Sequence, residues 1–188
     1  PPRQRATAGA YVPPFKLAAM LAAASQDPSS ASYQRLRWDA LRKSINGLVN
    51  KANRGNIKHV LPELFGENLI RGRGLLCRSV LKSQLASPAF APVYAALTAV
   101  LNTKLPELGE LLASRCLAQF KRAFRRNDKP VCLAAVNLLA HLVNQQVVHE
   151  VLALELLMLL LDSPSDDSVE LAVALATAVG ALLQDLCP

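Results

Sequence analysis

The residues whose types could support metal chemistry are few, and their spacing does not fit a metal site. His141, His149 and Glu150 lie within the segment HLVNQQVVHE. A helical zinc site of the HExxH kind places two histidines one turn apart, so that both imidazoles point at one ion. These histidines are two turns apart, and packing within or at the end of a helix is the favoured interpretation. We predict no metal site.

The sequence also lacks the residue patterns that enzymes use for catalysis. Gly72 and Gly74 in RGRG follow no predicted strand and lack the later positions of a phosphate-binding loop. Asp166 and Asp167 lie beside a predicted helix start, where carboxylates cap amides and complement the helix dipole. The chain has no GxSxG motif and no cysteine with an evident histidine partner. We therefore predict a protein that is not an enzyme and needs no cofactor.

The hydrophobic pattern predicts the elements that position the remaining side chains. Hydrophobic residues make up 52% of the 188-residue chain, which is enough for a substantial core. Leu and Ala recur at three- and four-residue spacing and β-branched alternation is nearly absent, so the predicted fold class is all-α. The predicted helices cover residues 14–25, 31–54, 57–67, 70–85, 88–103, 106–125, 129–144, 147–162 and 166–186.

Capping residues mark several of these helix starts. Ser87-Pro88 and Ser163-Pro164 each offer an N-cap followed by proline at the first helical position. Asn127-Asp128 precede Pro130 in a similar way. Pro62 is the exception, because it falls inside a predicted helix, where it should kink the helix or delay its start.

The short connections between these helices predict an open array of helix hairpins. Successive helices must return antiparallel, and the pairs repeat about every 40 residues, as in HEAT-like arrays. About four to five hairpins would fit as an α-α superhelix or solenoid, which suits this many helices better than a closed bundle. We expect residues 1–13 to form an extended lead-in and residues 14–188 to form a single domain.

The distribution of charge indicates which partners the chain meets, and the most apolar run and the cysteines indicate its compartment. All 21 Lys and Arg lie between Arg3 and Lys129, and this asymmetry suggests a basic part that meets RNA or an acidic partner. The run VLALELLMLLL at 151–161 is about half the length that spans a bilayer, and we predict a buried helix without membrane contact. The widely spaced cysteines indicate buried thiols in a reducing compartment: Cys77, Cys116, Cys132 and Cys187.

The segment from Tyr33 to Asn56 carries the most informative pattern. Helical geometry places a core on one side, formed by Trp38, Leu41, Ile45, Leu48, Val49 and Ala52. It places a polar face on the other, with Lys43, Gly47, Asn50, Lys51 and Arg54. A glycine in mid-helix costs roughly 1 kcal/mol relative to alanine. Either a partner approaches Gly47 closely beside Asn50 and Lys51, or Gly47 packs against a neighbouring helix of the same chain. The pattern alone leaves both interpretations open.

A second basic face occurs in the segment SRCLAQFKRAFRRNDK. Its apolar side carries Leu117, Phe120 and Phe124, and its basic side carries Arg115, Arg122, Arg125, Arg126 and Lys129. Structural stabilisation or plain solubility is the favoured role, because cations in the last turn complement the helix dipole. Contact with RNA or with an acidic protein is the alternative. The few aromatic residues fall on apolar faces, which weakens the case for sequence-specific RNA binding.

Several segments, taken in order, resemble the middle domain of the nucampholin-type pre-mRNA splicing factors. They are YVPP at 11–14, YQRLRWDALRKSINGLVNKAN at 33–53, ENLIRGRGLLCRSVLKSQ at 67–84, SPAFAPVYAAL at 87–97, FRRNDKPVCLAA at 124–135 and HLVNQQVVHEVLALELLMLLLDSPSDDSVE at 141–170. The resemblance covers nearly the whole chain. It is more specific to this family than to the wider class of middle domains of initiation factor 4G.

The resemblance implies a monomeric MIF4G-type domain of about five HEAT-like hairpins in a nuclear splicing factor. It also implies a partner, the DEAD-box helicase initiation factor 4A-III. In this family the domain is thought to hold the two helicase lobes apart and to deliver the inactive helicase to the spliceosome for assembly of the exon junction complex. The family's helicase-contact motif is matched by Gly47, Asn50 and Lys51 in SINGLVNK. Lys43 and Arg54 extend the predicted contact from their place on the same face.

Two other functions remain as alternatives. The first is a basic α-solenoid that binds RNA directly, through a surface that includes Arg122, Arg125, Arg126 and Lys129. The second is a scaffold for translation or mRNA decay of the same wider class, whose helicase would be a cytoplasmic paralogue. The choice of partner and the sign of the effect on the helicase separate these functions.

Overall fold

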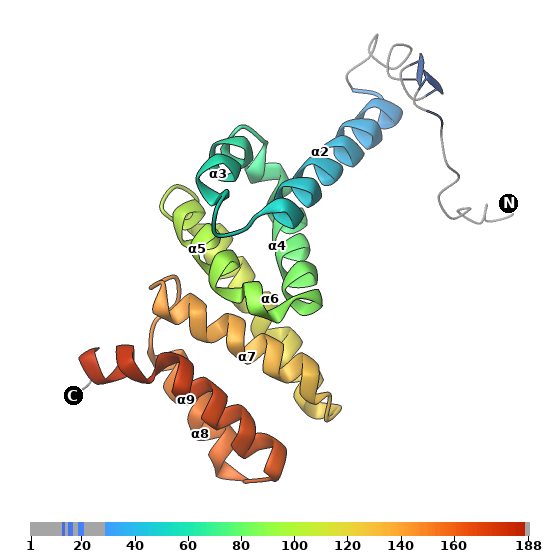
Figure 1. Ribbon diagram of the computed structural model, residues 1–188. Coiled ribbons are helices and arrows are strands. Elements are labelled where there is room, and N and C mark those ends of the chain that lie inside the picture. The colour runs from blue at the N-terminus through green and yellow to red at the C-terminus, as the bar shows by residue number, and fades with distance from the viewer. Residues whose placement is uncertain (1–12, 14, 17–18, 21–28, 187–188) are drawn as a thin grey trace, which may run out of the picture. The chain divides into compact units, whose positions relative to one another are not determined.

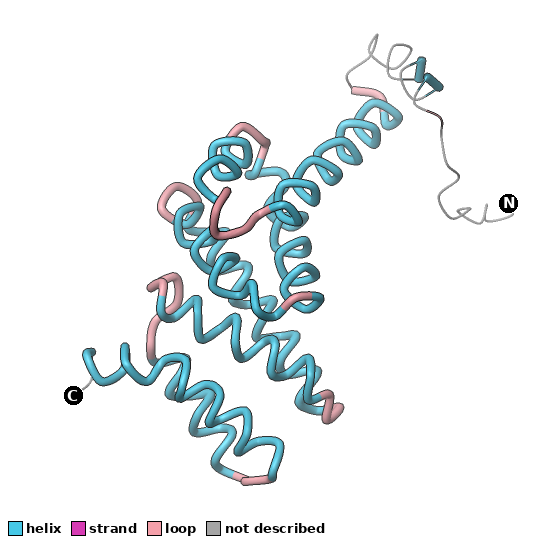
Figure 2. The backbone as a smooth tube through the Cα atoms, in the orientation of Figure 1, coloured by secondary structure: helices cyan, strands magenta, loops and turns pink. Residues whose placement is uncertain are grey.

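The computed structural model describes residues 13, 15–16, 19–20 and 29–186 (Figures 1 and 2). These residues form helices and loops and include no strand, so the predicted all-α fold class is confirmed. The expected lead-in at 1–13 lies outside the described residues except for Pro13, and of the expected helix at 14–25 only residues 15–16 and 19–20 are described, as helix. The chain divides into two compact units, residues 1–42 and 43–188.

The first unit contains the beginning of α2 (Ala31–Lys51). Ser30 precedes this helix, and its Oγ accepts a hydrogen bond from the backbone N–H of Tyr33 at 3.2 Å. Arg42 and Asp39, one turn apart, form an exposed ion pair at 2.9 Å. Trp38 and Leu41, predicted as core residues, are only half-buried.

The second unit consists of helix hairpins that stack in two layers. One layer contains α4 and α6, and the other contains α3, α5, α7 and α9, each in contact with the next member of its layer. Within the described residues, α2 to α9 form four hairpins, where the resemblance implied about five. The helices of this unit after α2 are α3 (Ile57–Phe65), α4 (Leu69–Ala86), α5 (Ala91–Asn102), α6 (Pro106–Arg125), α7 (Lys129–Asn144), α8 (Val151–Asp162) and α9 (Asp166–Leu186).

The core of the second unit is centred on α7. This helix contacts α4, α5, α6, α8 and α9, because its sequence KPVCLAAVNLLAHLVN is apolar around most of its circumference. Nine of its residues are buried: Cys132, Ala134, Ala135, Val136, Leu138, Leu139, Ala140, Leu142 and Val143. A two-sided helix of this kind requires neighbours on both sides, and the two layers supply them.

One capping prediction is confirmed, and α4 has a side-chain cap that was not predicted. Asp128 caps α7 by accepting a hydrogen bond from the N–H of Val131 at 3.4 Å, and Asn127 before it adopts a left-handed backbone with φ of 54°. Asn68 caps α4 by accepting from the N–H of Arg71 at 3.0 Å. The RGRG segment is therefore part of a helix start, as expected. Pro62 lies inside α3 without delaying its start at Ile57, and the helix ends at Phe65.

One capping prediction is confirmed in part. Ser87 is the N-cap residue and Pro88 begins the helix, but the Ser87 side chain makes no cap hydrogen bond and the helix is a short 3₁₀ helix, η1 (Pro88–Phe90), before α5. The prediction at Ser163 is wrong. At the start of α9 the capping residue is Ser165 and not Ser163. Ser165 and Ser168 exchange backbone-to-side-chain hydrogen bonds of 2.8 and 3.2 Å, which satisfy two amides at the helix start.

The prediction of a buried helix at 151–161 is also wrong in large part. Only Ala153, Leu156 and Leu160 of α8 are buried, because α8 packs mainly on α9 and touches α7 along one edge. Leu152 and Leu157 are half-buried. Five other large apolar side chains of α8 are exposed: Val151, Leu154, Met158, Leu159 and Leu161. Among the described helices, α9 has the length and composition of a membrane span. One stripe of it, through Leu171, Leu175 and Val179, is buried, and most of the helix is not.

Three cysteines are buried free thiols, as predicted: Cys77, Cys116 and Cys132. Cys187 lies outside the described residues. Burial raises the pKa of the Cys77 thiol to about 11 and that of Cys116 to about 12. Burial, with Asp128 and Asp167 nearby, also raises the pKa of Cys132. These thiols therefore stay protonated at neutral pH.

We expect the folded protein to protect these thiols from modification. In a Cys187→Ser variant near pH 8, Ellman's reagent should react at least about 100-fold more slowly than with the guanidinium-unfolded chain, because the thiolate is the reacting form. The time course of absorbance provides the measurement. Rapid stoichiometric labelling of one thiol in the folded variant would contradict the assigned burial.

Candidate protein-binding face

The C-terminal half of α2 carries an exposed polar face opposite a buried apolar one. Ile45, Leu48 and Val49 of α2 are buried, as is Ala52 just beyond its end. On the opposite side, the four predicted contact residues of the helix are exposed, and we call them the α2 face: Lys43, Gly47, Asn50 and Lys51. The predicted amphipathic pattern is confirmed over this half of the helix.

Gly47 lies in the middle of the α2 face with open space around it. A Cβ atom built on Gly47 would meet no atom of the described residues within 4 Å, apart from its own helix turn and chain neighbours. Close packing against a neighbouring helix therefore does not account for this glycine. Gly109 of α6 shows what such packing looks like, because a Cβ there would lie 2.2 Å from Asn102 Oδ1 and 2.8 Å from Val147 Cγ1.

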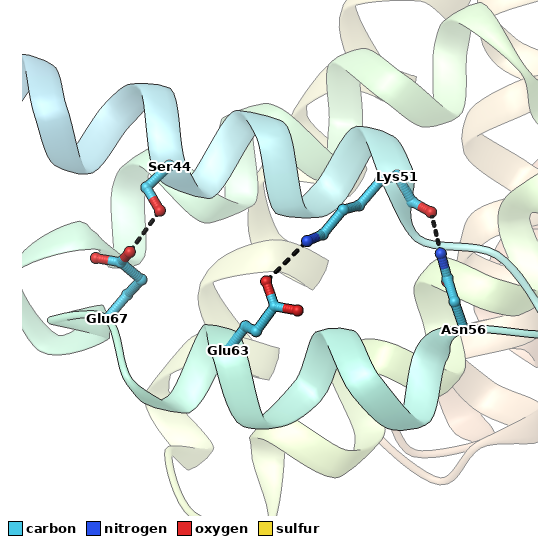
Figure 3. Close-up of polar contacts among 5 residues, drawn as sticks. All are labelled: Ser44, Lys51, Asn56, Glu63 and Glu67. Carbon is cyan, nitrogen blue, oxygen red and sulfur yellow. Dashed lines mark hydrogen bonds and ion pairs between the residues drawn. The ribbon is translucent and has the colours of Figure 1, made fainter.

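The side of α2 next to α3 is held by polar contacts (Figure 3). Ser44 Oγ donates a hydrogen bond to Glu67, and Lys51 Nζ forms an ion pair with Glu63 Oε2 at 2.7 Å. Asn56 Nδ2 donates to the backbone carbonyl of Lys51 at 2.7 Å. These contacts join the last two turns of α2 to α3 and its connecting loops, so the α2 face has a fixed orientation relative to α3.

The opposite side of the α2 face is held by α4. Asn50 Oδ1 accepts a hydrogen bond from Ser83 Oγ at 2.8 Å. The Nδ2 group of Asn50 has no hydrogen-bond partner within the part of the chain that the structure describes. Because Oδ1 is already paired, Asn50 offers a donor group to a binding partner.

The structure places Arg54 beyond the helix and not on its face, so the helical placement predicted for this residue is wrong. Helix α2 ends at Lys51, because Asn53 Oδ1 accepts from the N–H groups of Gly55 and Asn56 at 2.9 and 3.0 Å. Asn56 Oδ1 in turn accepts from the N–H of Asn53 at 2.8 Å. Arg54 is exposed in this turn, near the end of the α2 face.

The predicted basic surface divides into different environments. Arg122, Arg125 and Arg126 are exposed. Lys129 instead pairs with Asp167 at 2.9 Å and Glu170 at 2.6 Å. The hydrogen bonds that Lys129 donates to Glu170 and Asp167 raise the pKa of Lys129, so its charge serves to join the start of α7 to α9. Arg115 is half-buried, and its Nη1 donates to the carbonyl of Gly74 at 2.8 Å.

Comparison with known proteins shows the family. The MIF4G domain model matches residues 42–187. The chain belongs to the MIF4G domain family. It is 62% identical over 182 residues to the pre-mRNA-splicing factor CWC22 of Mycosarcoma maydis, covering 96% of this chain and 20% of that protein. It is 53% identical over 182 residues to the CWC22 homolog of Mus musculus, covering 97% of this chain and 20% of that protein.

The match confirms the resemblance drawn from the sequence segments. A further relative, the pre-mRNA-splicing factor cwc22 of Emericella nidulans, is 57% identical over 178 residues, 95% of this chain and 20% of that protein. This MIF4G domain thus spans about a fifth of the length of the curated relatives it matches. The family model includes the α2 face, the two stacked layers and α9. A single domain over residues 14–188 stays a prediction.

Sequence reasoning missed the residues that support the α2 face of this MIF4G domain. Glu63, Glu67 and Ser83 lie 12 to 33 residues away from their partners in α2. No spacing rule joins residues so far apart, because these contacts exist only once α3 and α4 pack beside α2. The amphipathic pattern of α2 therefore located the face, and the hairpins determined its geometry.

Replacing Gly47 with alanine should stabilise the MIF4G domain, because helix propensity favours alanine and nothing opposes the added methyl. We expect a gain of about 0.5–1 kcal/mol in the free energy of unfolding. Gly109→Ala should destabilise by about 1–3 kcal/mol, because Asn102 and Val147 must move. Guanidinium unfolding followed by circular dichroism measures both values.

Gly180→Ala provides the matched control, since Gly180 is also helical and has nothing within 4 Å of a built Cβ. It should resemble Gly47→Ala. A loss of stability in Gly47→Ala, beside a gain in Gly180→Ala, would show that Gly47 has a packing role within the fold.

Proposed function

We propose that this MIF4G domain is a non-enzymatic protein-binding domain of a nuclear pre-mRNA splicing factor, and that its partner is the DEAD-box helicase initiation factor 4A-III. The names of the relatives support the role in splicing. The observation that carries the proposed contact is Gly47, an exposed mid-helix glycine with open space around it. Such a position costs stability within the fold, and a partner that approaches the backbone closely accounts for it.

The α2 face suits a partner that is recognised by shape and hydrogen bonds. Gly47 lets the backbone of a partner approach the helix, and Asn50 Nδ2 offers donors beside it. Lys51 supplies a cation whose present partner is Glu63, and both side chains are about half exposed. An exposed pair of this kind contributes only about 0.2–1 kcal/mol, so Lys51 can change partner at small cost. Lys43 and Arg54 lie at the margin of this contact.

Inhibition by this domain needs no chemistry. A DEAD-box helicase must close its two lobes over ATP and RNA, and a partner that binds the open form better lowers the closed population by its differential affinity. A preference of about 1,000-fold for the open form corresponds to roughly 4 kcal/mol and keeps most molecules inactive. In this proposal the domain brings the open helicase to the spliceosome, where the exon junction complex assembles.

A tyrosine at position 47 should abolish helicase binding while the domain stays folded, because the added ring extends into open space. Gly47→Tyr should weaken binding of initiation factor 4A-III by at least about 100-fold, as expected for a residue at the centre of an interface. Gly180→Tyr is the matched control, with the same change at an open glycine of α9. Calorimetry measures binding, and RNA-stimulated ATP hydrolysis measures inhibition.

The same experiment separates the alternative functions. If the unmodified domain leaves the helicase unaffected and binds bare RNA with steep salt dependence, direct RNA binding replaces this proposal. If the domain accelerates hydrolysis, it belongs with the activating scaffolds of the wider class. Equal binding by Gly47→Tyr and the control would place the helicase contact elsewhere.

Changes at Lys51 and Glu63 should have opposite effects on helicase binding. Lys51→Met removes the charge that the helicase would meet and should weaken binding by about tenfold. Glu63→Gln removes the competing intramolecular partner and should leave binding unchanged or tighter. Calorimetric titration at one fixed salt concentration gives both affinities. Weaker binding by Glu63→Gln would mean that the ion pair itself, and not free Lys51, forms the contact.

A further inference from the structure

A groove between α4 and α6 carries four cations and no carboxylate. Its volume is about 460 Å³, and its charged lining consists of Arg78, Lys82, Arg115 and Arg122. Leu81 and Leu85 of α4 add apolar surface to the lining, and Leu85 is 36% exposed. The groove therefore combines basic and apolar side chains.

Helix geometry accounts for this concentration of charge. Arg78, Leu81, Lys82 and Leu85 follow one another at three- and four-residue spacing and share one side of α4. Arg115 and Arg122 are two turns apart on α6, which packs against α4. The two faces meet along the groove, so residues far apart in the sequence form one surface.

Arg115 is held in place by the second glycine of RGRG. Its Nη1 donates to the carbonyl of Gly74 at 2.8 Å, and a Cβ on Gly74 would lie 3.4 Å from its Nη2. That distance is an ordinary van der Waals contact, so the hydrogen bond to the Gly74 carbonyl is what holds the guanidinium against the α4 backbone. Because a carbonyl oxygen is neutral, the positive charge of Arg115 is not cancelled there.

The cations of the groove differ from several others in this unit, which have carboxylate partners. Lys51 pairs with Glu63, Arg73 with Glu107, and Lys129 with Asp167 and Glu170. Within the described ranges, none of the four groove cations takes part in an ion pair. A concentration of unpaired cations around a hollow raises the local positive potential and attracts anionic groups.

We infer that the groove binds an acidic segment of a partner protein that inserts leucine-like side chains between its carboxylates. Carboxylates would pair with the arginines in the bidentate geometry that guanidinium favours, while the apolar side chains cover Leu81 and Leu85. No aromatic side chain lines the groove, so nucleic-acid bases find no stacking platform there. This inference goes beyond the proposed function, because it requires neither the α2 face nor the helicase.

Fluorescence anisotropy with a labelled synthetic peptide tests the inference. The probe is a short helical peptide with glutamates flanking leucines at helical spacing, and a second peptide of equal composition has its leucines dispersed. Arg78→Glu combined with Lys82→Glu should weaken binding of the first peptide by at least about tenfold. The matched control, Lys58→Glu with Lys104→Glu, changes two exposed lysines outside the groove by the same charge and should have an effect below about threefold.

Three results decide whether the inference stands. The inference is supported if the groove variant loses affinity for the first peptide while the control variant keeps it, and if the dispersed peptide binds the unmodified domain more weakly than the first. Equal losses of peptide affinity in both double variants would mean that general charge attraction accounts for the binding, and would overturn the inference. Tighter binding of a uridine oligonucleotide than of the peptide, lost in the groove variant alone, would make the groove an RNA site and also overturn it. Gly47→Tyr should bind the peptide normally, so failure of the helicase contact and failure of the groove remain distinguishable.

Discussion

Burial of α7 on both sides is the constraint on which the architecture of the second unit depends. Its apolar surface extends around most of the helix, so one neighbouring layer cannot cover it. Helices α5 and α9 flank it within its own layer, and α4 and α6 cover it from the other layer. Once α4 and α6 are held against α7, their outer sides lie next to each other and produce the basic groove. The groove is thus a consequence of how the core closes.

The fold and its main helices could be predicted from the sequence because the signals are local. Periodicity gave the helices, and Asp128 caps α7, as predicted, by accepting from an amide within one turn of it. The errors occur where two nearby residues give the same local signal, or where the packing of neighbouring helices determines whether a side chain is buried. Serine is an equally good N-cap residue at positions 163 and 165, and the backbone conformation places Ser165 at the start of α9. The apolar run of α8 looked buried, but few neighbouring helices cover it.

The candidate site was predictable to the extent that one helix carries it. Gly47 stood out because a glycine on the polar side of a helix conflicts with helix propensity. Arg54 was misplaced because the paired asparagines, Asn53 and Asn56, end the helix before it. Lys129 was predicted to be part of a contact surface. The acidic residues that pair with it are 38 and 41 residues away in the sequence, so local spacing gave no sign of the pairing. Charge pairing across hairpins is a tertiary property that spacing along the chain does not contain.

The two proposed binding surfaces differ in whether their cations have carboxylate partners. On the proposed α2 face Lys51 already pairs with Glu63, so the contact we propose depends first on the open space at Gly47 and the amide of Asn50, and Lys51 adds a cation when it leaves Glu63. In the groove the four cations have no carboxylate partner within the described residues, so the binding that we propose there depends on Coulomb attraction and weakens as salt screens it. On these two proposals, a partner of the α2 face must fit its shape, whereas a partner of the groove must bring charge. Both regions use α4, through Ser83 and its chain neighbour Lys82, so one helix would support two surfaces that select their partners by different properties.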